Sequence, residues 1–181
     1  MKINDAIAWI HSRLPFGSRP GLERVQALLD LVGHPEKTVP TIHIAGTNGK
    51  GSTVSGLMEL IKECGLTVGT YTSPYVESFN ERIAIDGKPI ADADLVALVE
   101  KYRPLVEQLD ADEAVQGITE FETLTAMALD YFREQAVDVA IVEVGLGGLL
   151  DSTNVVEPML CAITTIGLDH TDILGDTLEK I

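Results

Sequence analysis

Apolar residues recur at intervals of three or four positions in several parts of the chain, a pattern typical of helices that bury one face. Residues 3–14 form the first such stripe. A later helix is expected to be capped by Asp92, and we expect Pro104 to kink it or end it. The other helices are predicted around 22–32, 54–61 and 124–131, with a further helix from about Asp176.

Short apolar runs between these helices are predicted to be strands. Residues 137–144 form a nearly continuous apolar run, as expected for a buried parallel strand. Asp86 and Gly87 lie between β-branched residues and predict a hairpin turn within 82–90. The other strands are expected at 41–45, 66–71 and 160–166. Because strands and helices alternate, the fold class is α/β, a mainly parallel sheet flanked by helices, with ligands beyond the carboxyl ends of the strands.

A glycine-rich segment, residues 46–52, follows the first strand at the start of a helix. Its glycines allow several backbone N–H groups to face one anion, and the helix N-terminus and Lys50 add positive charge. The segment therefore predicts a nucleotide-phosphate site. Only Thr47 and Asn48 separate its first glycine from the Gly-Lys pair, so it is a variant of the common P-loop, which has four residues there. A plain glycine-rich turn is the alternative.

Polar residues follow three other strands. Glu143 ends the buried apolar run, where a carboxylate needs a partner; Mg²⁺ is the partner we favour and a lysine is the alternative. Ser73 is either a metal or substrate ligand or a plain turn residue. Asp169 and His170 would lie beside Glu143 if their strands are neighbours, and His170 is either a ligand or a structural hydrogen bonder. These residues indicate phosphoryl transfer without identifying the acceptor.

The chain of 181 residues has 13 Lys plus Arg against 28 Asp plus Glu, a formal net charge of −15. Such a surface repels nucleic acids and anionic membranes. Since no apolar run could span a bilayer and no signal peptide is evident, we expect a cytoplasmic protein with neither nucleic acid nor membrane as partner. Cys64 and Cys161 are predicted to be buried thiols, and His11, His34 and His43 to be structural or surface residues.

Five motifs, in order, resemble the folylpolyglutamate synthase and dihydrofolate synthase family, a branch of the Mur ligases. They are HIAGTNGKGS, TSPYVESFNERI, TEFETLTA, IVEVGLGGLLDSTNVV and DHTDILGDTLEKI, and the resemblance extends from about Arg19 to the end of the chain. The glycine loop alone would indicate only the Mur ligase superfamily, whereas FNERI and LDSTN point to the folate branch. The resemblance implies a P-loop-containing domain of the Mur-ligase central type.

The resemblance also implies an ATP-dependent carboxylate–amine ligase. In this family ATP phosphorylates a pteroate or folate carboxylate, and the amino group of L-glutamate then displaces phosphate from the acyl phosphate. The implied cofactors are ATP and Mg²⁺, and the implied small-molecule partners are folate or dihydropteroate, glutamate and ATP. Metal ions and Lys50 would neutralise the anions that this reaction brings together.

The family's functional residues are carried over onto matching positions. Lys50, Glu143 and His170 are implied to be catalytic, and Ser73, Glu143 and His170 to be magnesium ligands. The ATP-binding residues would be Thr47, Asn48, Gly49, Lys50, Gly51 and Ser52. The pterin-side residues would be Thr119, Glu120, Phe121, Glu122, Leu150, Asp151 and Ser152, with Arg19, Pro20 and Gly21 near another pterin contact. Phe121 is equally explained as a core aromatic residue at a helix start.

The chain departs from the family pattern at several positions. Tyr75 and Val76 replace the last two residues of TSPHL, and Leu149 and Ser152 replace the arginine and alanine of GGRLDATN. The family also has a second domain that supplies the glutamate site, and a carbamylated lysine in an EKAG-type segment that Lys180 does not match. We therefore expect residues 1–181 to be the N-terminal ATP-binding domain, with the C-terminal glutamate-ligase domain absent from the chain, and to be inactive alone.

Two other interpretations remain open. A Mur-type ligase acting on a peptidoglycan precursor would share the glycine loop, the glutamate and the histidine. A non-catalytic nucleotide-binding module would need no metal cluster, so Glu143 and His170 argue against it. Within the folate branch, the sequence fits dihydrofolate synthase, folylpolyglutamate synthase or both activities.

Overall fold

The computed structural model describes residues 1–17 and 19–181. Its α-helices are α1 (Ile3–His11), α2 (Glu23–Leu31), α3 (Lys50–Glu63), α4 (Asp92–Asp110), α5 (Glu120–Glu134) and α6 (Thr171–Leu174). Its strands are β1 (Thr41–Ala45), β2 (Val68–Tyr71), β3 (Ile83–Ile85), β4 (Lys88–Pro89), β5 (Val139–Glu143) and β6 (Leu160–Ile163). Short 3₁₀ helices are η1 (Leu14–Phe16), η2 (Pro35–Lys37), η3 (Phe79–Arg82) and η4 (Ser152–Val155). Strands and helices alternate as predicted.

The strands form one sheet in the order β4-β3-β2-β5-β1-β6. β2, β5, β1 and β6 are parallel, whereas β3 and β4 are added antiparallel at one edge. The hairpin turns at Asp86 and Gly87, which both have positive φ, as a tight turn of this kind requires. Because the four parallel strands run the same way, the segments that follow them all lie beyond the carboxyl ends of the strands, at the same end of the sheet.

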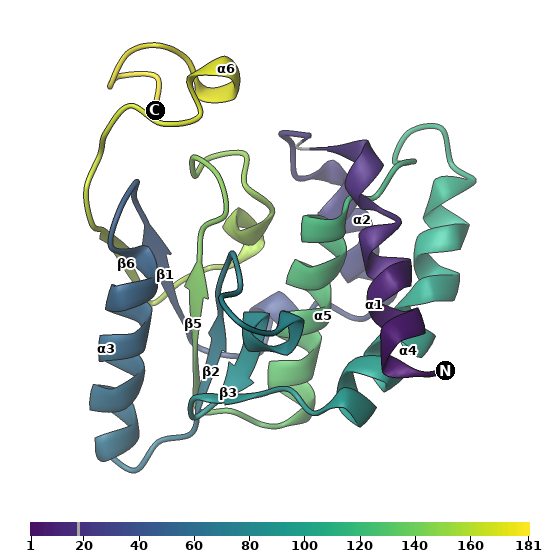
Figure 1. Ribbon diagram of the computed structural model, residues 1–181, viewed down its shortest axis with the longest axis horizontal. Coiled ribbons are helices and arrows are strands. Elements are labelled where there is room, and N and C mark those ends of the chain that lie inside the picture. Colours follow the sequence, from purple (N-terminus) through teal and green to yellow (C-terminus); the bar gives the residue numbers. More distant parts are fainter. Residues whose placement is uncertain (18) are drawn as a thin grey trace.

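Helices cover both faces of the sheet (Figure 1). On one face α3 packs on β1 and β5, where its Val54 and Met58 join Ile42 and Ile44 in a buried cluster. On the other face α5 packs against the sheet, with α1, α2 and α4 around it, and these helices share the larger core. None of the helices within residues 1–17 and 19–181 is long and apolar enough to cross a membrane.

Two sequence predictions about local structure are wrong. Both cysteines are exposed, because Cys64 directly follows α3 and Cys161 lies on the edge strand β6, which has a strand neighbour on one side only. No helix begins at Asp176; the short helix α6 precedes it. Pro104 was expected either to kink the helix that Asp92 begins or to end it. It does not end α4, which continues to Asp110.

The packing of β2 against α5 gives a stability prediction. A Cβ added at Gly69 would lie 2.6 Å from a ring carbon of Phe132, which is completely buried. We expect Gly69→Ala to lower the free energy of unfolding by about 1–3 kcal/mol. Gly56→Ala is the control, because its Cβ would meet nothing within 4 Å and alanine favours helix by up to about 1 kcal/mol. Urea unfolding of both variants checks this, and an equal loss in the two would contradict it.

Candidate active site

The glycine loop joins β1 to α3 and is pressed against the segment that follows β6. Gly46 and Gly49 have φ values of +131° and +84°, a region that disfavours side chains. A Cβ on Gly46 would lie 2.1 Å from Thr164 Oγ1. The amide of Thr47 donates to the carbonyl of Thr165 over 2.7 Å. The predicted order of strand, loop and helix start is therefore confirmed, and contacts from the segment after β6 fix the loop.

Lys50 begins α3 and folds back over the glycine loop. Its Nζ donates to the carbonyl of Gly46 at 2.7 Å and lies 3.4 Å from that of Thr47. A cavity of about 220 Å³ opens beside it, bounded by the loop, by residues 145–149 and by His170. The lysine charge and the N-terminus of α3 thus coincide in an otherwise acidic protein, which is the arrangement that holds phosphate.

Glu143 ends β5 and lies between Ser73 and the first turn of α3. Its side chain is buried, and its Oε2 accepts a 3.4 Å hydrogen bond from the amide of Ser73. A Cβ added to Gly51 would lie 3.8 Å from the same oxygen. Burial raises the pKa of Glu143, and the Ser73 amide and Lys50 oppose that rise. Among the described residues no lysine or arginine forms an ion pair with Glu143, so the alternative of a structural salt bridge is not what the structure shows.

His170 lies on the segment after β6 and is exposed. β1 separates β5 from β6, so Glu143 and His170 are not on neighbouring strands. His170 instead lines the smaller cavity with Lys50. Over residues 1–17 and 19–181, no three His, Cys, Asp or Glu side chains are grouped as metal ligands. The structure thus brings Ser73 and Glu143 together, while ligation by His170 stays a prediction.

A larger cavity of about 810 Å³ lies next to the smaller one. Most of the predicted pterin-side residues line it, namely Arg19, Pro20, Thr119, Glu120, Phe121, Leu150, Asp151 and Ser152, together with Ser73. Two of these segments are joined directly, because the amide of Gly21 donates to the carbonyl of Leu150 at 3.3 Å. The ring of Phe121 lies close to Gly145, where an added Cβ would be 2.5 Å from its Cζ, and its centroid is 5.7 Å from that of Tyr71, so it serves both the cavity wall and the core.

An ion-pair group within this cavity joins the predicted residue Glu120 to Arg82 and His11, which were not predicted to belong to the site. Glu120 pairs with Arg82 at 2.6 Å and contacts His11 Nδ1 at 3.1 Å. The ring of His11 stands edge-on to that of Phe79, with centroids 5.2 Å apart. Arg82 belongs to the FNERI motif, which was a signal in the sequence. His11 had none, because only the packing of α1 against α5 brings it to the cavity.

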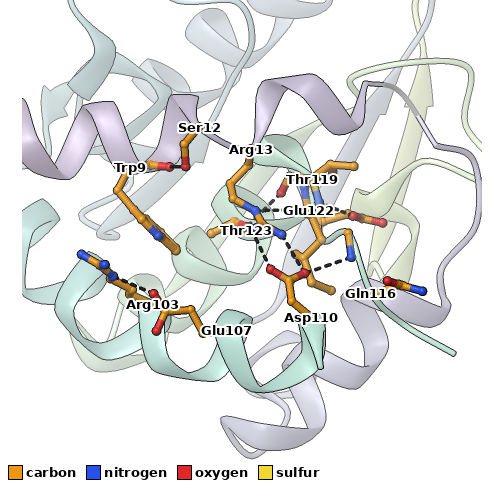
Figure 2. A network of polar contacts seen from close by, with 12 residues as sticks. Trp9, Ser12, Arg13, Arg103, Glu107, Asp110, Gln116, Thr119, Glu122 and Thr123 are labelled. Atoms are coloured by element: carbon orange, nitrogen blue, oxygen red, sulfur yellow. Dashed lines mark hydrogen bonds and ion pairs between the residues drawn. The ribbon is translucent and has the colours of Figure 1, made fainter. Parts of the chain in front are cut away.

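The start of α5 is fixed by polar contacts that hold the cavity wall (Figure 2). The Thr119 side chain caps the helix by accepting from the amide of Glu122, whose carboxylate accepts from the amide of Thr119. Arg13 forms an ion pair with Asp110 at 2.7 Å and donates to the carbonyl of Ile118 at 2.8 Å. These contacts position the residues before and after the cap.

Glu122 does not line the larger cavity. Its carboxylate is 1% exposed and lies 2.9 Å from Arg24 Nε, close enough for an ion pair but without the alignment of a hydrogen bond. Arg24 in turn donates to the carbonyl of Arg19 at 2.6 Å. In the structure Glu122 therefore anchors the segment that carries Arg19, and its contact with substrate stays a prediction.

The two cavities share one wall. Gly145, Leu146, Gly148 and Leu149 line both of them, as do Leu174 and Ile181. The first four of these residues follow Glu143, so the segment after β5 carries a carboxylate at its base and then separates the side with Lys50 from the side with Glu120 and Phe121. Such a layout places a phosphate site and an acceptor site next to each other.

Comparisons with known proteins agree with this geometry. The chain is 55% identical over 178 residues to a dihydrofolate synthase/folylpolyglutamate synthase of Bacillus subtilis, covering 98% of the chain and 41% of the relative. It is 43% identical to a folylpolyglutamate synthase of Lacticaseibacillus casei, covering all of the chain and 42% of the relative. A solved FPGS–AMPPCP–folate complex superposes with a TM-score of 0.91 at 43% identity, covering 99% of the chain and 43% of that structure.

A search of family models gave no match. The chain spans about two fifths of the length of the curated relatives it matches. Within that span, sequence, fold and the order of the motifs all agree, and the chain has the Mur-ligase fold of the matched structures. By sequence and by fold, the chain is similar over its whole length to about two fifths of the folylpolyglutamate synthases and dihydrofolate synthases that it matches.

Proposed function

We propose that the chain carries the ATP-binding and pteroyl-binding side of a ligase that adds L-glutamate to a folate or dihydropteroate carboxylate. One observation carries the proposal: the cavity of Lys50 and the glycine loop shares a wall with the larger cavity. A similar structure was solved as a complex with AMPPCP and folate, an ATP analogue and a pteroyl compound. The chain spans about two fifths of its relatives, and the proposal assigns glutamate binding to the second domain that the family resemblance implies.

The reaction would divide between the two cavities. The amides of residues 46–52 and the ammonium of Lys50 would hold the ATP phosphates. Glu120, Phe121 and Asp151 would orient the acceptor in the larger cavity. A carboxylate oxygen of the acceptor would attack the γ-phosphorus as ADP leaves, giving an acyl phosphate. The glutamate nitrogen would then attack the acyl carbon, lose a proton and displace phosphate.

Mg²⁺ fits the residues beside the glycine loop. Glu143 is a buried carboxylate, and among the described residues it accepts one long hydrogen bond, from the amide of Ser73. Ser73 also carries a hydroxyl. Oxygen donors of this kind suit Mg²⁺. Ser73 and Glu143 would hold the ion, with His170 as a third proposed ligand, and bound Mg²⁺ would neutralise phosphate charge. ATP and Mg²⁺ are abundant in the cytoplasm, where we propose that the protein acts.

An assay of the full-length protein tests this function. ATP and L-glutamate are supplied with dihydropteroate, with tetrahydrofolate or with a UDP-muramoyl precursor, and the amide product is identified by mass spectrometry. We expect glutamate-dependent product with at least one pteroyl substrate, and only in the presence of Mg²⁺. Product with the muramoyl precursor alone would overturn the proposal, as would ATP hydrolysis that no acceptor stimulates.

A further inference from the structure

A buried histidine lies in the middle of the strand that leads to the glycine loop. His43 of β1 is 7% exposed, and its strand neighbours Ile42 and Ile44 face the cluster under α3. Its Nε2 lies 2.8 Å from the hydroxyl of Thr153, which is completely buried. A polar side chain in this position costs free energy unless it is hydrogen-bonded, so the contact with Thr153 accounts for how it is accommodated.

The direction of the hydrogen bonds follows from the groups present. The Thr153 hydroxyl donates to Asp151 Oδ1, because a carboxylate oxygen accepts. The hydroxyl therefore uses its lone pair toward His43, whose Nε2 must carry the proton and donate. Burial lowers the pKa of His43, which favours this neutral ring, while the charge of Asp151 acts in the opposite direction. The chain of donors runs from His43 through Thr153 to Asp151.

Asp151 also forms hydrogen bonds with the wall between the two cavities. Its Oδ2 accepts from the amide of Leu146 at 2.8 Å, and its own amide donates to the carbonyl of Gly148 at 3.1 Å. Asp151, which is 6% exposed, thereby holds both Leu146 and Gly148 of the wall by hydrogen bonds. The wall is thus hydrogen-bonded, through Thr153, to the same strand that carries the glycine loop.

We propose that His43 and Thr153 are positioning residues, which fix the 145–151 wall relative to the glycine loop so that the acceptor carboxylate meets the terminal phosphate. The proposal rests on the proposed function for the reaction that it serves. Neither residue lines either cavity among the described residues, so they act through Asp151. A displacement of about 1 Å between reacting groups can cost about 100-fold in rate, so small movements of this wall are consequential.

Matched variants of the full-length protein test the proposal. Thr153→Val removes the hydroxyl at nearly constant shape, Thr153→Ser keeps it, and His43→Leu removes the donor. We expect Thr153→Val and His43→Leu to lower kcat for ligation by about 10- to 100-fold while the KM for ATP changes little. Thr153→Ser should restore most of the rate. The double variant should lose no more than the worse single one, because the residues form one chain.

A second measurement separates this proposal from the proposed function. Amide hydrogen exchange at Leu146 should be faster in Thr153→Val and in His43→Leu than in Thr153→Ser, whatever substrate the enzyme uses. If exchange behaves so but no pteroyl substrate is consumed by the unaltered enzyme, the function fails and the hydrogen-bonded chain stands. Unchanged exchange at Leu146, or equal rate losses in Thr153→Ser and Thr153→Val, would overturn the positioning role.

Discussion

Lys50→Ala is expected to remove nearly all ATP-dependent ligation from the full-length protein, by at least about 100- to 1,000-fold in kcat. Lys50 is the one described lysine that lines the smaller cavity, and its Nζ lies 2.7 Å from the loop carbonyl of Gly46. The ammonium group of Lys50 is therefore placed to stabilise the negative charge that develops on the outer phosphates. The protein elsewhere is acidic, so nothing in its overall field compensates.

The control for this variant lies on the same helix. Lys62→Ala removes an exposed lysine from the last turn of α3, where it pairs loosely with Glu59 at 3.8 Å. Steady-state ligation and Mg-ATP calorimetry on both variants, with circular dichroism to verify folding, make the comparison. Loss of activity in Lys62→Ala as well, or normal turnover in folded Lys50→Ala, would contradict the phosphate-binding role.

Glu143→Gln is expected to abolish Mg²⁺-dependent turnover, again by about 100-fold or more, because an amide oxygen is a poorer ligand for Mg²⁺ than a carboxylate. The free energy of unfolding, in contrast, should be higher in Glu143→Gln than in the original protein. A buried carboxylate costs free energy when it is charged, and glutamine carries no charge. We therefore expect the variant, without ligands, to unfold at a higher urea concentration than the original protein at neutral pH.

The pH dependence of that gain follows from the raised pKa. The folded protein holds the Glu143 proton more tightly than the unfolded chain, so the contribution of this group is favourable below its ordinary pKa of 4.5 and is lost as pH rises through the raised value. The stability difference between Glu143→Gln and the original protein should accordingly grow from about pH 4.5 upward. Glu157→Gln, an exposed substitution after η4, serves as the control. A difference that is constant with pH would show that Glu143 carries no such cost.

The fold was largely predictable because its signals are local. Apolar periodicity, the Asp86 and Gly87 turn and the continuous run ending at Glu143 each depend on neighbours in the sequence, and each was confirmed. The wrong predictions concern the edge strand β6 and the ends of helices. Whether Cys161 is buried depends on what covers β6, which no local pattern encodes, and the predicted helix start at Asp176 is wrong because the helix of this segment lies earlier, at Thr171–Leu174.

The candidate site was predictable where residues follow strands of the parallel sheet. The glycine loop, Ser73 and Glu143 are brought together by that rule alone. His11 was missed, because a helix face carries no sign of the cavity against which it packs. Glu122 shows the converse, since a motif match does not distinguish a residue that contacts substrate from one that caps a helix and pairs with Arg24.

The hydrogen bonds between the glycine loop and the segment after β6 have a consequence for how the protein folds. Thr47 and Gly167, which exchange two of these bonds, are separated by 120 positions in the chain. Contacts of such sequence separation require closure of a long loop, so we expect them to form after the local helices and hairpins. The phosphate-binding conformation is therefore completed only once β6 has docked, and a nascent chain that has emerged only through α3 carries the nucleotide motif without its fixed shape.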